Sequence, residues 1–118
     1  WIICIMNKNK KKKTNFNYKS IPLGYYDKIF NKKKGVQSKW HHIHYNFVKK
    51  IMGKYNKHLD IACAGGTFIG NLDKKKKSFG IDVSNKQINY AKEKYENKNH
   101  KFYRIEKISF LLKIISLT

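Results

Sequence analysis

The sequence predicts an α/β fold, a partial doubly wound parallel sheet with helices on its N-terminal side. Two short apolar segments, residues 57–62 and 78–83, are predicted strands, and each carries an acid near its end. A loop of small residues and a short predicted helix, residues 67–72, lie between them. Strands that alternate with helices are typical of a parallel sheet. The chain supplies few strands, so we expect this sheet to be incomplete.

The composition limits the chain to one domain and gives it a strong positive charge. The 118 residues are 41% hydrophobic, which is enough for a modest core. The 27 Lys and Arg residues against 7 Asp and Glu residues give a net charge of +20, a balance typical of proteins that bind polyanions. Only Arg104 is an arginine, whereas specific recognition favours the planar guanidinium group. We therefore expect the lysine excess to be compositional bias, with nonspecific polyanion binding as its by-product.

Neither end of the chain predicts a membrane span. The apolar stretches 1–6 and 108–117 are too short to cross a bilayer. Residues 7–19 are rich in lysine and have no periodicity, so residues 1–19 are expected to be a disordered basic arm and residues 20–118 the folded part. Cys4 and Cys63 match no disulfide or metal spacing, which favours a reducing, cytoplasmic location.

The first strong helical pattern covers residues 38–54. Ser38 is its candidate N-cap, and Gly53 and Asn56 mark its end. Apolar residues follow one face of this helix at helical spacing: Trp40, Ile43, Phe47, Val48 and Ile51. The predicted strand 57–62 follows directly.

A second helix is predicted after the strand 78–83. Ser84 followed by Gln87 has the spacing of a capping box. Ile88, Ala91 and Tyr95 would form the buried face of this helix. Residues 97–99 end it, and residues 101–105 are a candidate third strand.

The residues that indicate chemistry lie where the first two strands end. Ligands of an open parallel sheet bind beyond the carboxyl ends of its strands. Asp60 and Asp82 stand there, 22 positions apart, close to the spacing of about 20 between a nucleotide-binding loop and the acid that binds the ribose hydroxyls. A dinucleotide fingerprint would place Ala62, Ala64 and Thr67 where it needs glycines, which is a poor match.

The stretch from Asp60 to Gly66 instead resembles the first motif of class I S-adenosylmethionine-dependent methyltransferases, acid-x-glycine-x-glycine-x-glycine. Ala62 and Ala64 stand where that family usually has glycine. The resemblance extends over roughly residues 23–104, including the run Gly-Ile-Asp-Val-Ser at 80–84. It implies a Rossmann-like fold and S-adenosyl-L-methionine as the cofactor, with the chain as the N-terminal part of a truncated methyltransferase domain.

The resemblance also implies a role for each motif residue. Asp60 would orient the loop and contact the methionine ammonium group of the cofactor. The backbone at Ala62, Ala64 and Gly66 would pass beside the methionine and ribose parts. Asp82 would bind the ribose hydroxyls, and Val83 would pack on the adenine. Because methyl transfer from a sulfonium is an in-line displacement, catalysis would be mostly positioning.

The resemblance leaves the activity of the chain open. The acid expected after the third strand is missing, with Glu106 a weak substitute, and no catalytic residue is predicted. We expect part of a cofactor site, little or no activity, and a small-molecule, lipid or sugar-type methyl acceptor in the full-length ancestor. The alternatives are a basic nucleic-acid-binding module and an inactive truncated remnant.

Other polar and aromatic residues have simpler interpretations. His41, His42 and His44 have no acid or cysteine near them in the sequence, so no metal site is expected, and one histidine would line the cofactor pocket or all would pack or face solvent. Tyr25 and Tyr26 would form either a lid over the cofactor or part of the core. Cys63 is expected to be a small buried filler rather than a nucleophile.

Overall fold

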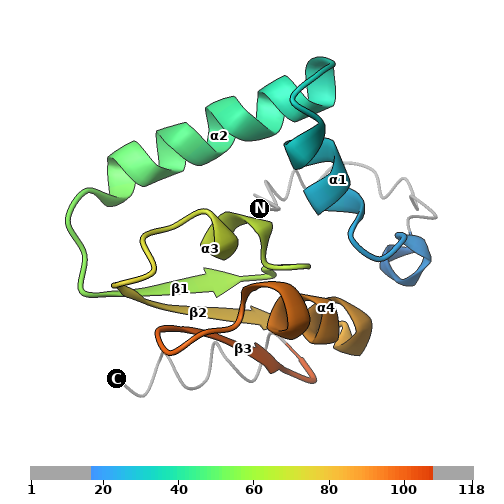
Figure 1. The fold of residues 1–118 in the computed structure, drawn as a ribbon. Helices are drawn as coiled ribbons and strands as arrows, with labels where there is room; N and C mark the ends of the chain where they lie inside the picture. The colour runs from blue at the N-terminus through green and yellow to red at the C-terminus, as the bar shows by residue number, and fades with distance from the viewer. Residues whose placement is uncertain (1–16, 108–118) are drawn as a thin grey trace, which may run out of the picture.

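The computed structural model describes residues 17–107 and has a three-stranded parallel sheet in the order β1-β2-β3 (Figure 1). The strands are β1 (Lys57–Ile61), β2 (Lys77–Asp82) and β3 (His100–Arg104). Asp60 pairs with Gly80 in the register of β1 and β2, and Asp82 pairs with Arg104 in that of β2 and β3. This arrangement is a partial Rossmann-like α/β fold, as the sequence predicts.

The helices between the strands also agree with the sequence. They are α3 (Thr67–Gly70) and α4 (Asn85–Tyr95). Ser84 caps α4, because its Oγ accepts a hydrogen bond from the backbone N–H of Gln87 at 3.4 Å. Ile88 and Ala91 are fully buried and Tyr95 packs against them. Each strand boundary falls within one residue of its prediction, whereas α3 ends two residues before its predicted end.

The N-terminal part folds into a 3-10 turn, η1 (Tyr18–Ser20), and two helices, α1 (Tyr25–Lys32) and α2 (Val36–Met52). Residues 1–16 of the predicted arm lie outside the described residues, and Tyr18 and Lys19 belong to η1. In Figure 1 α2 extends above α3 and the sheet, with α1 beside its first turns. These helices provide a wall over one side of the sheet.

The prediction that Ser38 caps α2 is wrong. Gly35 is the N-cap, and Ser38 lies inside the helix. Ser38 is buried because it faces α1, where its Oγ donates a hydrogen bond to the carbonyl oxygen of Phe30 at 3.3 Å. The same carbonyl oxygen contacts Nε2 of His42 at 2.8 Å. These contacts join the end of α1 to the start of α2, and Gly53 ends α2 as predicted.

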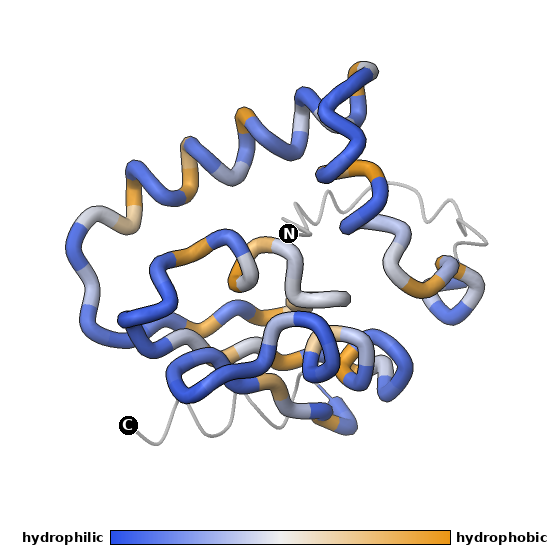
Figure 2. Tube along the Cα trace, viewed as in Figure 1, coloured by the Kyte–Doolittle hydropathy of each residue, from blue (hydrophilic) through white to orange (hydrophobic). Residues whose placement is uncertain are grey.

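The apolar stripe of α2 faces away from the core. Figure 2 shows the orange positions of this helix alternating with hydrophilic turns. Four of its five predicted members are between 55% and 68% exposed: Trp40, Ile43, Phe47 and Ile51. The fifth, Val48, is partly buried. Helical periodicity therefore identifies the helix, but its apolar face does not mark the side that packs on the sheet.

The core lies between the sheet and α3 and α4. Its buried cluster comprises Cys63, Ile69, Ile88, Ala91 and Phe102. Gly66 lets the loop after β1 approach this core, since a Cβ there would lie 2.7 Å from the ring of Phe102 and its φ is +78°. Packing against this core thus fixes the position of the loop.

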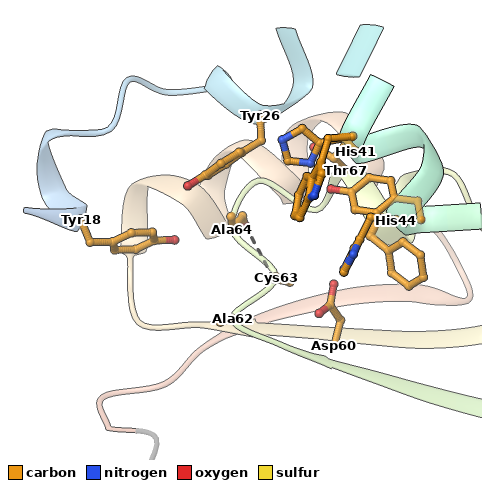
Figure 3. Close-up of a pocket in the computed structure, with 12 residues that line it drawn as sticks. Tyr18, Tyr26, His41, His44, Asp60, Ala62, Cys63, Ala64 and Thr67 are labelled. Atoms are coloured by element: carbon orange, nitrogen blue, oxygen red, sulfur yellow. Dashed lines mark hydrogen bonds between the residues drawn. The ribbon is translucent and has the colours of Figure 1, made fainter. Parts of the chain in front are cut away.

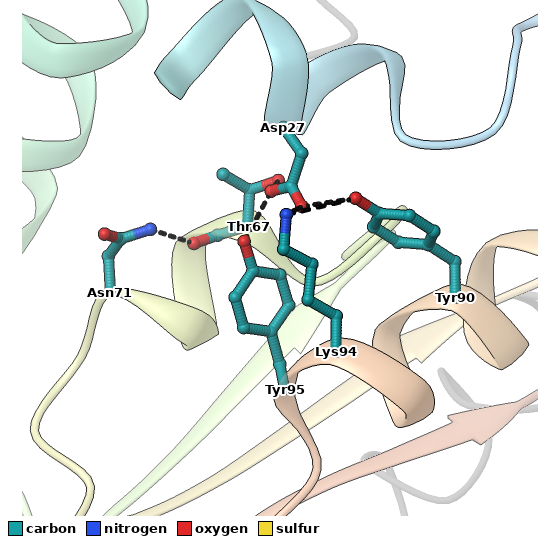
Figure 4. Close-up of polar contacts among 6 residues, drawn as sticks. All are labelled: Asp27, Thr67, Asn71, Tyr90, Lys94 and Tyr95. Carbon is teal, nitrogen blue, oxygen red and sulfur yellow. Dashed lines mark hydrogen bonds and ion pairs between the residues drawn. The ribbon is translucent and has the colours of Figure 1, made fainter.

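A buried carboxylate attaches α1 to the rest of the fold (Figure 4). Asp27 is 2% exposed. It accepts hydrogen bonds from Thr67 Oγ1 at 2.5 Å, from Tyr90 Oη at 2.7 Å and from Tyr95 Oη at 2.7 Å, and Lys94 Nζ lies 2.7 Å away. Burial raises the pKa of Asp27, but the hydrogen bonds from these four groups outweigh it, and the net pKa is below its usual value. α1 is therefore held in place over the loop by α3 and α4.

Within residues 17–107, no helix is long and apolar enough to cross a membrane.

Candidate functional site

A pocket of about 290 Å³ opens between the N-terminal helices and the loop after β1 (Figure 3). This volume is at the lower end of the range of small-molecule sites, which is about 300–1,000 Å³. One wall comes from β1, its loop and α3, and the other from η1, α1 and α2. The lining residues are Tyr18, Tyr26, Trp40, His41, His44, Tyr45, Asp60, Ala62, Cys63, Ala64, Thr67 and Phe68.

The loop has left-handed backbone at all three positions of the glycine-type motif. The φ angles are +62° at Ala62, +48° at Ala64 and +78° at Gly66. Two of the three described non-glycine residues with positive φ are these alanines; the third is Lys33. A Cβ in this region costs roughly 1–2 kcal/mol. The alanines thus adopt the backbone conformation that glycine favours, and they do so on the wall of the pocket.

Replacing either alanine by glycine is expected to stabilise the protein. The relief of backbone strain, partly offset by the greater freedom of glycine in the unfolded chain, gives Ala62→Gly and Ala64→Gly about 0.5–1 kcal/mol each. Urea unfolding at neutral pH measures this difference. Ala91→Gly, inside α4, is the matched control and is expected to destabilise. Destabilisation by both loop substitutions would contradict the strained geometry.

Asp82 lies at the carboxyl end of β2 and is 3% exposed. Its carboxylate accepts hydrogen bonds from the backbone N–H of Ala64 at 2.9 Å and of Ser84 at 2.8 Å. The Tyr18 hydroxyl lies 3.0 Å from both carboxylate oxygens. Asp82 therefore connects the loop to β2, and it is oriented to accept hydrogen bonds from a hydroxyl group. Burial, followed by the charge of Asp82, raises the pKa of Tyr18 well above its usual value, so Tyr18 is the donor.

Asp60, in β1, is 5% exposed and lines the pocket. Burial raises its pKa to about 6, and the charge of Asp82 adds to this effect. A carboxylate kept in a dry site at such a cost is typical of functional sites. Figure 3 shows the carboxylate facing the pocket, with the ring of His44 directed toward it from α2.

The opposite wall consists largely of rings. Trp40 stacks on His44 with ring centroids 4.9 Å apart, and Tyr45 and Phe68 form an edge-type pair with ring centroids 5.1 Å apart. Tyr26 points into the pocket from α1 (Figure 3). The position of Tyr26 fits the lid interpretation, whereas Tyr25 is exposed and does not line the pocket.

Two histidines of α2, His41 and His44, line the pocket, whereas the sequence interpretation placed one there or none. Burial lowers the pKa of His41, and the neighbouring His44 adds to this effect, so the imidazole of His41 is neutral at pH 7. Within residues 17–107 no group of three His, Cys, Asp or Glu residues has an arrangement that would hold a metal ion.

The remaining candidate residues lie in the core, at a helix end and at the surface. Cys63 is buried in the core cluster, and burial raises the pKa of its thiol, which agrees with a filler role. Gly66 caps α3 and does not line the pocket. Val83 is 40% exposed just beyond the end of β2. The sequence missed Tyr18, whose contact with Asp82 spans 64 positions and follows no local pattern.

No protein-family model matches the sequence, and no curated protein does. Solved structures are similar in fold. A TehB-like SAM-dependent methyltransferase from Corynebacterium glutamicum has 21% identity and a TM-score of 0.44, over 57% of this chain and 41% of that one. YjhP from E. coli has 15% identity and a TM-score of 0.48, over 68% and 36%. A SAM-dependent methyltransferase from Anabaena variabilis has 17% identity and a TM-score of 0.47, over 69% and 36%. The matched regions thus span less than half of each of these structures, and at these identities the likeness concerns the fold alone.

Proposed function

We propose that this chain binds S-adenosylmethionine and forms the cofactor-binding part of a methyltransferase. The observation that supports this most is the position and hydrogen bonding of Asp82. At the carboxyl end of β2, beside a left-handed loop of small residues, its two oxygens accept from a hydroxyl group at 3.0 Å. A ribose offers two hydroxyls to such a carboxylate, so the residues present fit the cofactor.

The side chains around the loop have complementary roles in this proposal. Asp82 would accept the ribose hydroxyls, and Val83 would cover the adenine. The backbone at Ala62 and Ala64 would pass beside the methionine part, and Asp60 would face its ammonium group. When bound, the cofactor supplies an electrophilic methyl group, and the protein positions it and excludes water. The acceptor would be a small molecule.

Tyr18 occupies the position of a ligand hydroxyl on Asp82, so binding requires the tyrosine to release the carboxylate. Removing its hydroxyl is expected to favour the ligand, because one hydrogen bond to a charged group no longer competes. Such a bond is worth about 1.5 kcal/mol, which corresponds to about a tenfold tighter Kd for Tyr18→Phe. Tyr103→Phe, at an exposed ring on β3, is the control and should leave Kd unchanged.

Isothermal titration calorimetry with S-adenosylmethionine and S-adenosylhomocysteine tests the proposal. The wild-type chain is expected to bind both ligands. Asp82→Asn, which keeps the side-chain shape but loses the charge and one acceptor, is expected to weaken binding about 100-fold or more, since two charge-assisted hydrogen bonds are impaired. The exposed Asp73→Asn is the matched control. Absence of heat from a chain that circular dichroism shows to be folded would overturn the proposal.

A further inference from the structure

The lining of the pocket has an unusual composition for this chain. The lining includes five aromatic side chains of Tyr, Trp or Phe and one acid, Asp60, and none of the described lysines or the arginine. The sequence contains 27 Lys and Arg residues. Among residues 17–107, the lysines and the arginine therefore stay off this cavity, and its charged lining residue is an acid.

Four of the five aromatic side chains that line the cavity come from three α-helices. Tyr26, labelled in Figure 3, comes from α1. Trp40 and Tyr45 come from α2, and Phe68 comes from α3. Aromatic faces carry partial negative charge, and cations lie over them within about 6 Å of the ring centroid. Rings around a buried carboxylate thus attract a cation that can shed its water, such as an ammonium group with methyl or methylene substituents. Within the described residues, an anion there would meet Asp60 with no lysine or arginine in the lining.

The aromatic wall stands across the pocket from the loop. Ala62 and Ala64 line the loop side, and Tyr26, Trp40 and Tyr45 line the helix side. If the loop holds the cofactor, the aromatic wall faces the space next to it. A molecule bound at that wall would therefore be a second ligand beside the cofactor rather than part of the cofactor.

We propose that the wall formed by Tyr26, Trp40 and Tyr45 is a subsite for a small organic cation, a protonated or methylated amine, next to the cofactor loop. The assignment of this amine as the methyl acceptor rests on the proposed function: a protonated amine would lose its proton to solvent, and its nitrogen lone pair would then attack the cofactor methyl group while S-adenosylhomocysteine leaves. The recognition of the cation itself does not rest on it, because it depends on the rings, whereas Asp60 would face the ammonium group of the cofactor.

Titration calorimetry with choline and with its neutral isostere 3,3-dimethyl-1-butanol tests this subsite. The two probes have the same shape and differ in charge, so a cation site is expected to bind choline at least about tenfold more tightly. The choline titration is repeated with saturating S-adenosylhomocysteine. An acceptor subsite keeps its affinity for choline, whereas competition between the two ligands would overturn the acceptor assignment. Equal affinity for choline and the isostere would overturn the cation site.

Variants of neighbouring rings make the test specific. Tyr26→Leu and Trp40→Leu are each expected to weaken choline binding at least about threefold, and Tyr25→Leu, whose ring does not line the pocket, is the matched control. Thermal unfolding of each variant checks that it is folded. Equal loss in Tyr25→Leu and Tyr26→Leu would contradict the subsite.

The two proposals fail separately. Loss of choline selectivity with intact S-adenosylhomocysteine binding removes the subsite alone. Choline selectivity without binding of either adenosyl ligand removes the methyltransferase proposal and leaves the cation site.

Discussion

Replacing Asp27 by alanine is expected to lower the free energy of unfolding by about 3–5 kcal/mol, because removing one partner of a buried ionic network leaves the others without compensation. The hydroxyls of Thr67, Tyr90 and Tyr95 and the ammonium group of Lys94 would all lose the same carboxylate. Urea unfolding at pH 7 measures the change.

The control for this prediction is Asp73→Ala, at an exposed turn where the carboxylate accepts one local hydrogen bond, from the backbone of Lys75. That change is expected to cost less than about 1 kcal/mol. A similar small cost for Asp27→Ala would show that α1 does not depend on this network.

The stabilisation by Asp27 also depends on pH. Because the pKa of Asp27 is lowered on folding, this stabilisation is present above the unfolded pKa near 4 and is lost as pH falls through the lower folded value.

Replacing Asp60 by asparagine is expected to have the opposite effect at neutral pH. The pKa of Asp60 rises from 3.8 to about 6 on folding, so the folded state holds the proton more tightly than the unfolded state. The stability that comes from the protonated form is present below pH 3.8 and is lost as pH rises through 6. The loss is up to about 3 kcal/mol, at 1.36 kcal/mol for each pH unit. Asp60→Asn should therefore be more stable than wild type at pH 8 by up to this amount.

The pH dependence separates this cause from better packing. The difference between Asp60→Asn and wild type should shrink toward zero below pH 4, as measured by urea unfolding at several pH values. Titratable groups around Asp60 are Tyr45 and His44 on α2, Cys63 in the loop and Asp82 on β2. Repeating the series in a His44→Gln background removes the histidine contribution. A difference that stays constant with pH would contradict the raised pKa.

Asp27 and Asp60 have opposite effects on the stability of the fold. Asp27 is surrounded by donors and stabilises the arrangement of the helices. Asp60 is buried at a cost and faces the pocket, where a cation would compensate it. Stability given up at a site of this kind is typical of residues kept for binding.

Local signals were enough to predict the sheet and its helices. The strand at residues 57–61, the Ser84 cap and the buried face of α4 all follow from patterns within about ten residues. The three glycine-type positions of the motif, Ala62, Ala64 and Gly66, are also the positions where the backbone of this loop is left-handed.

Contacts between distant residues could not be predicted in the same way. Asp27 meets Thr67 across 40 positions and Tyr95 across 68, and Tyr18 meets Asp82 across 64. No periodicity connects such pairs, since they depend on how α1 and η1 dock after the sheet forms. The apolar face of α2 could not be placed for the same reason. The spacing of its apolar residues shows that they share one face of the helix, but not what that face packs against.

The most direct test of the central claim, that Asp82 holds the ribose of an adenosyl ligand, is a comparison of S-adenosylhomocysteine with its 2′,3′-dideoxy analogue by titration calorimetry. A carboxylate built to accept two hydroxyls should reject the analogue by about 100-fold or more in the wild-type chain. In Asp82→Asn the two ligands should bind with nearly equal, weak affinity. Equal binding of the two ligands to the wild-type chain would contradict the claim.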